Sequence, residues 1–379
     1  MNEYIHIISF DVPYPANYGG VIDVFFKIKS LKELGVRVIL HCFQYNDKQT
    51  SEELEKVCDK VYYYKRNTSF WAQLSFLPYT VYSRKNNDLL KNLNNDNYPI
   101  LFEGLMSCYY LKHKSLKNRT KLVRECNIEH EYYFKLFQTV SHPVKKLFYL
   151  TESIKLKAFE KNISKANHIY AISASEQQQL HHRYPDSDIS FVPCFHSNNA
   201  VKIRPGKSDY ILYHGNLSVA ENEQAALYLV KEVFPELSLQ CIITGKKPSE
   251  KLRNAIKKQK SITLIANPED DEMNALIANA QINILITQQT TGLKIKLLNA
   301  LFSGRHIVVN NGILEGSGLD AVCHIANTAQ EQISICKKLS ELPFTEEMIT
   351  EREKHLLPAY SNLYQAEFII DILRKLTAQ

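Results

Sequence analysis

Short apolar runs alternate with longer amphipathic segments along the chain, and this pattern predicts strands that alternate with helices. In the first half, strands are predicted over residues 4–9, 37–42, 60–64, 100–102, 121–126, 168–172 and 189–192. A helix is expected over residues 21–34, where Gly35 is a stop signal, and a longer helix over residues 145–165. Strands separated by helices of this length favour βαβ units and a mainly parallel sheet.

A polar stretch, residues 197–208, lacks an amphipathic period and is interpreted as a linker. A second α/β series follows it, with strands expected over residues 210–215, 239–244, 262–265, 282–286 and 306–309. Pro358 is expected to break the helical pattern before a last amphipathic helix over residues 360–376. The sequence therefore predicts two parallel-sheet α/β domains joined by a short linker.

The composition is that of a protein with two globular domains: 379 residues, of which 45% are hydrophobic and 23% are charged. The net charge of +6 suits an anionic substrate, a membrane surface or a nucleic acid, so the sign of the charge selects no partner. The eight cysteines form no CxxC pair and show no zinc-like spacing, and we expect a reducing compartment. The first residues are expected to form a strand rather than a signal peptide, and no run of about 18 apolar residues predicts a membrane-spanning helix.

The most informative stretch is residues 282–301, where an apolar strand leads into a polar loop and then into a helix expected to begin at Gly292. The first amides of a helix lack internal partners, so this glycine with Lys294 and Lys296 in the first turn suits a bound anion. Both lysines could instead belong to an ordinary solvated helix face. Cations in the first turn oppose the helix dipole, which favours a phosphate at this place, more for Lys294 than for Lys296.

A second loop, residues 13–20, follows the first strand and ends in Gly19 and Gly20. The glycines could let a phosphate group approach the backbone, or they could form a tight start to a helix after Pro13 and Pro15. Ligands of parallel sheets bind at the carboxyl ends of the strands, which both loops follow. The two loops therefore predict a ligand held between two α/β halves.

The order and spacing of several motifs resemble those of the retaining glycosyltransferases of the GT-B type, family 4. These motifs lie at residues 13–20, 127–133, 171–176, 215–222, 244–245, 292–301, 303–309 and 312–316. The resemblance covers most of the chain and implies two Rossmann-like domains that face a central cleft. It implies an acceptor domain over residues 1–200, a donor domain over residues 207–357, and a C-terminal helix, residues 360–379, that crosses back onto the first domain.

The resemblance also implies an activity. A sugar would be transferred from a nucleotide sugar, with retention at the anomeric carbon, to a glycan or a lipid-linked acceptor. The product would be a bacterial-type surface polysaccharide or glycoconjugate. The enzyme would work in the cytoplasm, and a location at the inner face of the cell membrane stays open. No metal ion and no other cofactor is expected, because lysines and helix amides can stabilise the departing diphosphate. No nucleic-acid partner is expected.

By the same resemblance, the catalytic candidates are Asn127, His130 and Lys294. Asn127 and His130 follow a strand, and His130 would orient the sugar or shuttle a proton to the acceptor, although a lone histidine is as often a packing residue. The donor-binding candidates are Gly19, Gly20, His214, Gly215, Asn216, Gly245, Lys246, Thr291, Gly292, Leu293, Lys296, Asn299 and Glu315.

The chain departs from the family pattern at the donor loop. Many members carry a Glu-x7-Glu pair there, but here the second position is Asn299 and the first falls near Thr291 or Gly292. The usual Arg and Lys after the first strand of the second domain are missing, and Lys246 and Lys247 could compensate. Two alternatives stay open: a non-catalytic sugar- or nucleotide-binding protein of this fold, and a nucleotide-sugar 2-epimerase that needs no acceptor. A dinucleotide-dependent dehydrogenase is disfavoured, because no G-x-G-x-x-G follows the first strand of either domain.

Residues 70–85 and 132–148 combine aromatic side chains with lysine and arginine. Such segments suit a membrane interface, but they are equally typical of core packing beside an ordinary surface. Peripheral membrane contact through these two segments is therefore a hypothesis, tied to an acceptor that is lipid-linked or carried by a membrane.

Overall fold

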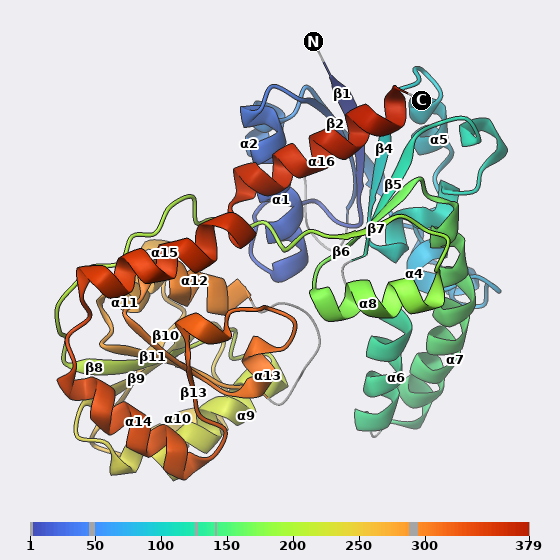
Figure 1. The fold of residues 1–379 in the computed structure, drawn as a ribbon. Coiled ribbons are helices and arrows are strands. Elements are labelled where there is room, and N and C mark those ends of the chain that lie inside the picture. The colour runs from blue at the N-terminus through green and yellow to red at the C-terminus, as the bar shows by residue number, and fades with distance from the viewer. Residues whose placement is uncertain (1–2, 45–49, 126–127, 141, 288–294, 379) are drawn as a thin grey trace. The chain divides into compact units, whose positions relative to one another are not determined.

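The computed structural model describes residues 3–44, 50–125, 128–140, 142–287 and 295–378. Contacts within the chain divide it into two compact units. Unit 1 consists of Met1–Phe195 and Asn362–Gln379, and unit 2 consists of His196–Ser361. Each unit has its own parallel sheet with helices packed around it (Figure 1). The predicted pair of parallel-sheet α/β domains is thereby confirmed.

The sheet of unit 1 has seven strands in the order β3-β2-β1-β4-β5-β6-β7, and neighbouring strands are parallel. The strands are β1 (Tyr4–Ser9), β2 (Arg37–Gln44), β3 (Lys60–Lys65), β4 (Ile100–Glu103), β5 (Lys121–Glu125), β6 (His168–Ala171) and β7 (Ile189–Phe191). From β1 the sheet grows outward in one direction through β2 and β3, and in the other direction from β4 to β7. The carboxyl ends of β1 and β4 flank a topological switch point, which is where open α/β sheets bind ligands.

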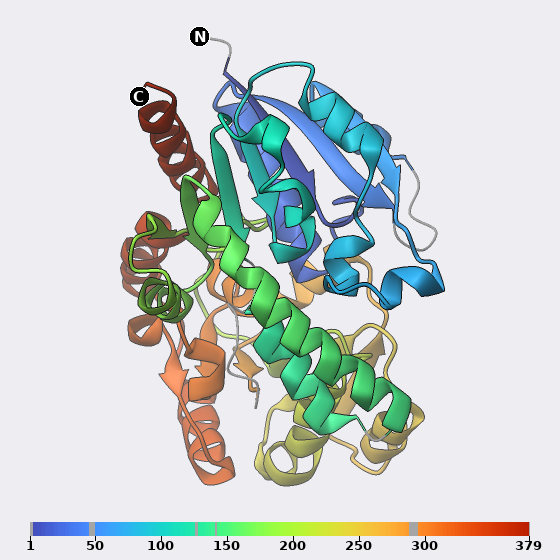
Figure 2. The same cartoon turned by 90° about the vertical axis from the view of Figure 1, so that its right-hand side faces the viewer.

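Helices cover both faces of this sheet (Figure 2). They are α1 (Gly19–Glu33), α2 (Glu52–Val57), α3 (Phe70–Gln73), α4 (Tyr79–Tyr82), α5 (Asn87–Leu93), α6 (Glu129–Thr139), α7 (Pro143–Glu160), α8 (Ala174–Arg183) and α16 (Asn362–Thr377). Helices α1 and α16 pack together on one face, and α5, α7 and α8 cover the other. Helices α6 and α7 pack side by side as a hairpin that extends beyond the sheet (Figure 1).

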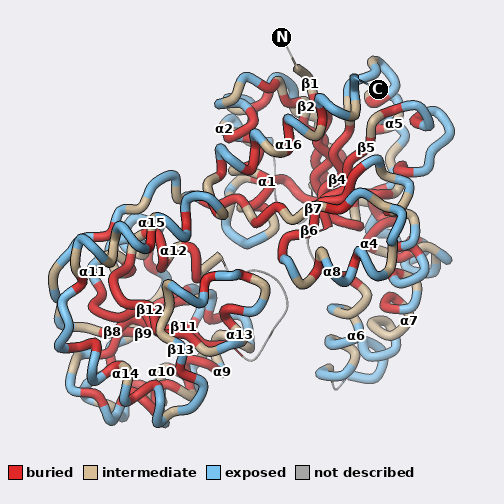
Figure 3. The backbone as a smooth tube through the Cα atoms, in the orientation of Figure 1, coloured by how far each residue is buried: buried red, intermediate tan, exposed pale blue. Residues whose placement is uncertain are grey.

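The core of unit 1 follows the two-residue period of its strands. Ile7 of β1 and Leu122 of β5 enter the apolar cluster beneath α1 and α16, whereas the adjacent Ile8 and Val123 enter the cluster beneath α7 and α8. Figure 3 shows the resulting buried strands at the centre of each unit. Because both faces are covered, the strands direct apolar side chains to both sides of the sheet, as is typical of parallel sheets.

The sheet of unit 2 has six parallel strands in the order β10-β9-β8-β11-β12-β13, with its switch point between β8 and β11. The strands are β8 (Tyr210–His214), β9 (Gln240–Gly245), β10 (Ile262–Ala266), β11 (Ile282–Leu285), β12 (His306–Val309) and β13 (His324–Ile325). The helices are α9 (Ala220–Tyr228), α10 (Glu250–Lys257), α11 (Asp270–Asn279), α12 (Ile295–Ser303), α13 (Asn311–Leu314), α14 (Ala329–Glu341) and α15 (Glu346–Tyr360).

Pro358 does not break the helix at its own position, and the sequence-based expectation was wrong there. Helix α15 continues through Pro358 to Tyr360, and the chain becomes extended only at Ser361. Proline in a helix costs the amide hydrogen bond to the residue four positions earlier. Pro358 lies in the last turn, where the buried side chains of Leu356 and Tyr360 hold the helix in place. Among the described residues, no helix has the length and apolar character that a membrane span requires.

Candidate functional site

The carboxyl edge of the unit 2 sheet brings three elements together around the ammonium group of Lys296. Lys296 lies at the start of α12 and donates from Nζ to Oδ1 of Asn222 in α9, at 2.9 Å. Its Nζ also lies over the ring of Tyr213 at the end of β8, 5.7 Å from the ring centroid. A cation predicted from the sequence is thus positioned beside the switch point of this sheet.

His214 ends β8 next to this cation. It is 3% exposed, and among the described residues its Nε2 has no hydrogen-bond partner. Burial, followed by the charge of Lys296, lowers the pKa of His214 to about 3. The imidazole is therefore neutral near pH 7. A buried nitrogen without a partner is costly, so this atom is suited to pair with a polar group of a ligand or with water.

The loop after β8 is held in one conformation by its own polar groups. Asn216 accepts hydrogen bonds from the backbone and side chain of Ser218, at 3.1 and 2.7 Å. A Cβ added to Gly245, at the end of β9, would lie 1.8 Å from the carbonyl oxygen of Gly215, so only glycine fits there. Lys246 is exposed directly after Gly245. Four predicted donor-binding residues therefore lie on two adjacent strand ends.

The remaining donor candidates of unit 2 have different positions. The Oδ1 atom of Asn299, in α12, accepts a hydrogen bond from the side chain of Asn198 at 2.9 Å, so its amide nitrogen remains the group suited to a ligand. Glu315 is exposed directly after α13. Five predicted site residues lie outside the described residues: Asn127, Thr291, Gly292, Leu293 and Lys294.

In unit 1, the loop that precedes α1 is fixed by residues that the sequence did not single out. Asp11 accepts hydrogen bonds from the hydroxyl of Tyr18, at 2.6 Å, and from the amide of Val12, at 2.8 Å. Buried Arg84 donates from Nε to the carbonyl of Phe10 at 2.9 Å, and burial lowers the pKa of its guanidinium to about 9.

Gly19 and Gly20 are the first two residues of α1. A Cβ added to Gly20 would lie 2.6 Å from the ring of Phe10. A larger residue at position 20 would have to displace this ring, which favours the interpretation of Gly20 as part of a tight helix start. Gly19 directly precedes it, and its predicted approach to a ligand stays a prediction.

His130 lies at the start of α6 and is tied to a carboxylate. Its Nδ1 donates to Oε2 of Glu160 at 2.8 Å, and its carbonyl accepts a hydrogen bond from Ser153. Arg183 also donates to Glu160, at 3.0 Å. Burial raises the pKa of Glu160, but His130 and Arg183 outweigh it and hold this pKa below its usual value. In catalytic His–carboxylate pairs, the carboxylate fixes one ring nitrogen and the other nitrogen faces the ligand. The His130–Glu160 pair suits this role, and it also suits a role in packing.

Two buried glutamates beside His130 were missed by the sequence reading. Glu129 directly precedes it, and burial raises the pKa of this carboxyl to about 7. Glu125 ends β5, and neither of its oxygens has a hydrogen-bond partner among the described residues. The signal that could have found them is the position of acidic residues at and just after the end of a predicted strand.

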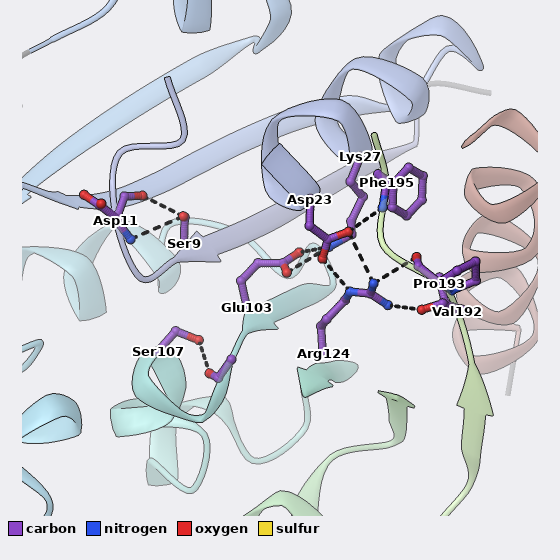
Figure 4. Close-up of polar contacts among 11 residues, drawn as sticks. Ser9, Asp11, Asp23, Lys27, Glu103, Ser107, Arg124, Val192, Pro193 and Phe195 are labelled. Carbon is purple, nitrogen blue, oxygen red and sulfur yellow. Dashed lines mark hydrogen bonds and ion pairs between the residues drawn. The ribbon is translucent and has the colours of Figure 1, made fainter. Parts of the chain in front are cut away.

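A buried ionic network lies near the switch point of unit 1 (Figure 4). Lys27 donates to both oxygens of Glu103, at 2.7 and 2.8 Å, while Arg124 donates to Asp23 at 2.8 and 3.2 Å. Asp23 also accepts from the backbone amide of Phe195 at 2.7 Å. Two acids and two bases leave the network formally neutral. It joins α1 to the ends of β4 and β5 and to the chain after β7, so its role is structural.

Comparison with known proteins finds a family match within unit 2. Residues 208–336 match the family model described as "Glycosyl transferases group 1". Among curated proteins, the chain is 29% identical over 333 residues to an "Uncharacterized 44.6 kDa protein in cps region" of Klebsiella pneumoniae. That alignment covers 83% of this chain and 84% of the relative.

Solved structures of similar fold match over nearly the whole chain. A sucrose-phosphate synthase from Thermosynechococcus elongatus is 13% identical with a TM-score of 0.71, and the match covers 100% of both chains. Anabaena HepE in complex with UDP and glucose is 11% identical with a TM-score of 0.67, covering 99% of this chain and 100% of that one. At these identities the likeness concerns the fold. The chain therefore has the GT-B fold, and residues 208–336 of its second unit are similar to the glycosyl transferases group 1 family.

Proposed function

We propose that this protein is a glycosyltransferase that moves a sugar from a nucleotide-sugar donor to a glycan or lipid-linked acceptor, with retention at the anomeric carbon. One observation carries the proposal: the segment that matches glycosyl transferases group 1 holds the ammonium group of Lys296 against Tyr213 at the end of β8. The next residue, buried His214, has a ring nitrogen with no hydrogen-bond partner among the described residues. HepE with UDP-glucose, and the Escherichia coli structure described as bound with UDP-2-fluoro glucose, support a nucleotide sugar as the donor class.

The proposed work of unit 2 is to stabilise the leaving group. When the bond between the anomeric carbon and the diphosphate oxygen breaks, negative charge develops on the diphosphate and positive charge on the sugar. Lys296 is held by Asn222 and Tyr213 where it would face that negative charge, and Lys294 is assigned the same task from its sequence position. The two lysines would supply the compensating charge, so we propose neither a metal ion nor another cofactor.

The proposed work of unit 1 is to bind the acceptor. Retention requires the acceptor oxygen to form its bond with the anomeric carbon on the face from which the diphosphate leaves, while the acceptor proton passes to a base. Glu129, whose pKa is raised to about 7, and His130, oriented by Glu160, are the groups we assign to the acceptor hydroxyl. The relative in a cps region supports a surface polysaccharide or glycoconjugate as the product.

The test is turnover of a panel of UDP-, GDP-, ADP- and CMP-sugars, measured as release of the nucleotide with and without a bacterial lipid extract as acceptor. We expect one donor class to be consumed in an acceptor-dependent manner. Lys296→Met should lower the rate by about 10²-fold or more, as the loss of one charge-stabilising donor does in other enzymes. Lys337→Met, an exposed lysine of α14, is the matched control and should leave the rate unchanged.

Other outcomes would overturn the proposal in distinguishable ways. A donor that binds but is never consumed, with any acceptor, would indicate a non-catalytic binding protein. A donor that is converted at equal rates without acceptor would indicate an epimerase. Retention is tested separately, because an inverted anomeric configuration in the product, measured by proton NMR, would contradict that part alone.

A further inference from the structure

Helix α7 has two apolar faces, and only one of them packs against the core of unit 1. Leu156 and Phe159 face inward and are buried in the core. Val144, Leu147 and Ile154 are instead 70%, 64% and 62% exposed. Their spacing, together with Thr151 and Ala158, is that of a single helix face, opposite to the buried one. A continuous exposed stripe of this kind on a long helix indicates a partner that covers it.

A second group of exposed apolar side chains follows β3. Phe70 and Trp71 of α3, with Leu74 and Phe76 after it, are between 60% and 100% exposed. The short α3 buries only Ala72. Four large apolar side chains within seven residues are thus presented to solvent, which is unusual for a loop of a soluble protein.

The two groups lie on connected parts of unit 1. Lys155 of α7 donates to the carbonyl of Gln73 at 3.4 Å, and Glu152 of α7 accepts from the amide of Tyr79 at 2.7 Å. The rings of Tyr79 and Phe148 pack edge to face. These contacts fasten the α3–α4 segment to α7, and Figure 1 labels α4 and α7 in unit 1. The docking face is defined here as the seven exposed side chains Phe70, Trp71, Leu74, Phe76, Val144, Leu147 and Ile154.

The two chain segments that carry most of the docking face are rich in positive charge. Residues 60–87 contain five lysines and arginines, and residues 132–151 contain three lysines, while neither range contains an aspartate or a glutamate. Lys65, Lys145 and Lys146 are exposed among them. The nearby carboxylate of Glu152 is buried and paired with Lys155. A partner that complements this face therefore has an anionic surface to pair with the lysines and an apolar interior to receive the apolar side chains.

We propose that the docking face binds unit 1 to an anionic lipid bilayer. The aromatic and aliphatic side chains enter the boundary between headgroups and acyl chains, and the lysines pair with lipid phosphates. A second copy of the chain fits less well, because it would place two lysine-rimmed faces against each other. The proposal does not rest on sugar transfer, but it places unit 1 where a lipid-linked acceptor would be found.

The protein contains its own reporter, because Trp71 of the docking face is its single tryptophan. The full chain is mixed with phosphatidylcholine vesicles that contain or lack phosphatidylglycerol, and tryptophan emission and flotation are measured. We expect a blue shift and flotation with the anionic vesicles at low salt, and release at high salt. The absence of both responses at low salt would overturn the proposal. An emission already blue-shifted without lipid, in a chain that sediments as a dimer, would assign the face to a second copy.

Two sets of variants separate the apolar and the charged contributions. Leu147→Glu with Ile154→Glu should abolish flotation, whereas Leu357→Glu, at an exposed position of α15, should leave it unchanged. Lys145→Gln with Lys146→Gln should weaken binding by about fivefold per lysine. All four positions are exposed, so circular dichroism and the melting temperature should match those of the wild type. Equal flotation of every variant would contradict the proposal.

Discussion

Glu125 illustrates how one residue can make stability depend on pH. Burial, then the negative charges of Glu160, Glu129 and Glu176, raise its pKa well above the usual value. The folded state therefore favours the protonated carboxyl. Its contribution to stability is fully present below the unfolded pKa, at about pH 4.3, and is lost as the pH rises toward the folded value.

Glu125→Gln should remove this loss, because glutamine has no proton to release. Relative to wild type, the variant should be more stable at pH 8 than at pH 5. The gain is about 1.4 kcal/mol for each pH unit over which the folded carboxyl stays protonated and the unfolded one is ionised. Urea unfolding at the two pH values measures this difference. Glu341→Gln is the exposed control and should show none. A wild-type-like pH dependence in Glu125→Gln would contradict the account of this residue.

Gly245 tests the close approach of two strand ends in unit 2. Gly245→Ala places a Cβ 1.8 Å from the carbonyl oxygen of Gly215, where only a backbone shift can relieve the contact. We expect a loss of stability of about 3 kcal/mol or more, measured by chemical denaturation. Gly35→Ala meets no atom within 4 Å and is strained only by its φ of +84°, so it should cost about 1 kcal/mol. Equal costs for the two variants would argue against the close approach.

Residue types at strand ends could be predicted from the sequence, but their partners could not. Lys296 was identified because a cation early in a helix is unusual. In the structure it donates a hydrogen bond to the side chain of Asn222, 74 positions earlier in the chain. Arg84 was missed, because nothing local shows that its guanidinium reaches the carbonyl of Phe10. Long-range pairs of this kind depend on the packing of several elements, which a local pattern does not contain.

At the scale of elements, strands were predicted closely, because their apolar runs are continuous in a sheet covered on both faces. The prediction over residues 306–309 coincides with β12. The two-residue β13 was missed because it is too short to show a pattern. The helix over α6 was missed because two of its four aromatic residues are exposed and the other two are only partly buried, so its apolar stripe is weak.

The ionic network of unit 1 joins α1 to β4, to β5 and to the chain after β7. We expect that removing one of its carboxylates will destabilise the fold. Asp23→Ala removes the carboxylate that Arg124 and Lys27 share, and it also removes the acceptor of the Phe195 amide. Because the site is buried, the cost should be about 3–5 kcal/mol. Chemical denaturation measures it, with Asp186→Ala as the exposed control. A cost equal to that of the control would show that the network does not fasten α1 to the sheet.

At the scale of the whole molecule, the fold class could be predicted because two runs of alternating strands and helices leave few other architectures. The donor, its base and its sugar could not be predicted, because the glutamate pair that usually binds them is replaced around Asn299. The site is assembled from loops that follow strands, and loops carry specificity while the sheet carries the fold.

The central claim is that unit 2 binds a nucleotide sugar through Lys296. The most direct measurement is a thermal-shift screen of the full chain against UDP, GDP, ADP, CMP and their common sugar conjugates. A ligand at 100 times its dissociation constant should add about 2.7 kcal/mol of stability. The account predicts a shift with one nucleotide class, greatly reduced in Lys296→Met and retained in Lys337→Met. No shift with any nucleotide, or an equal shift in Lys296→Met, would contradict it.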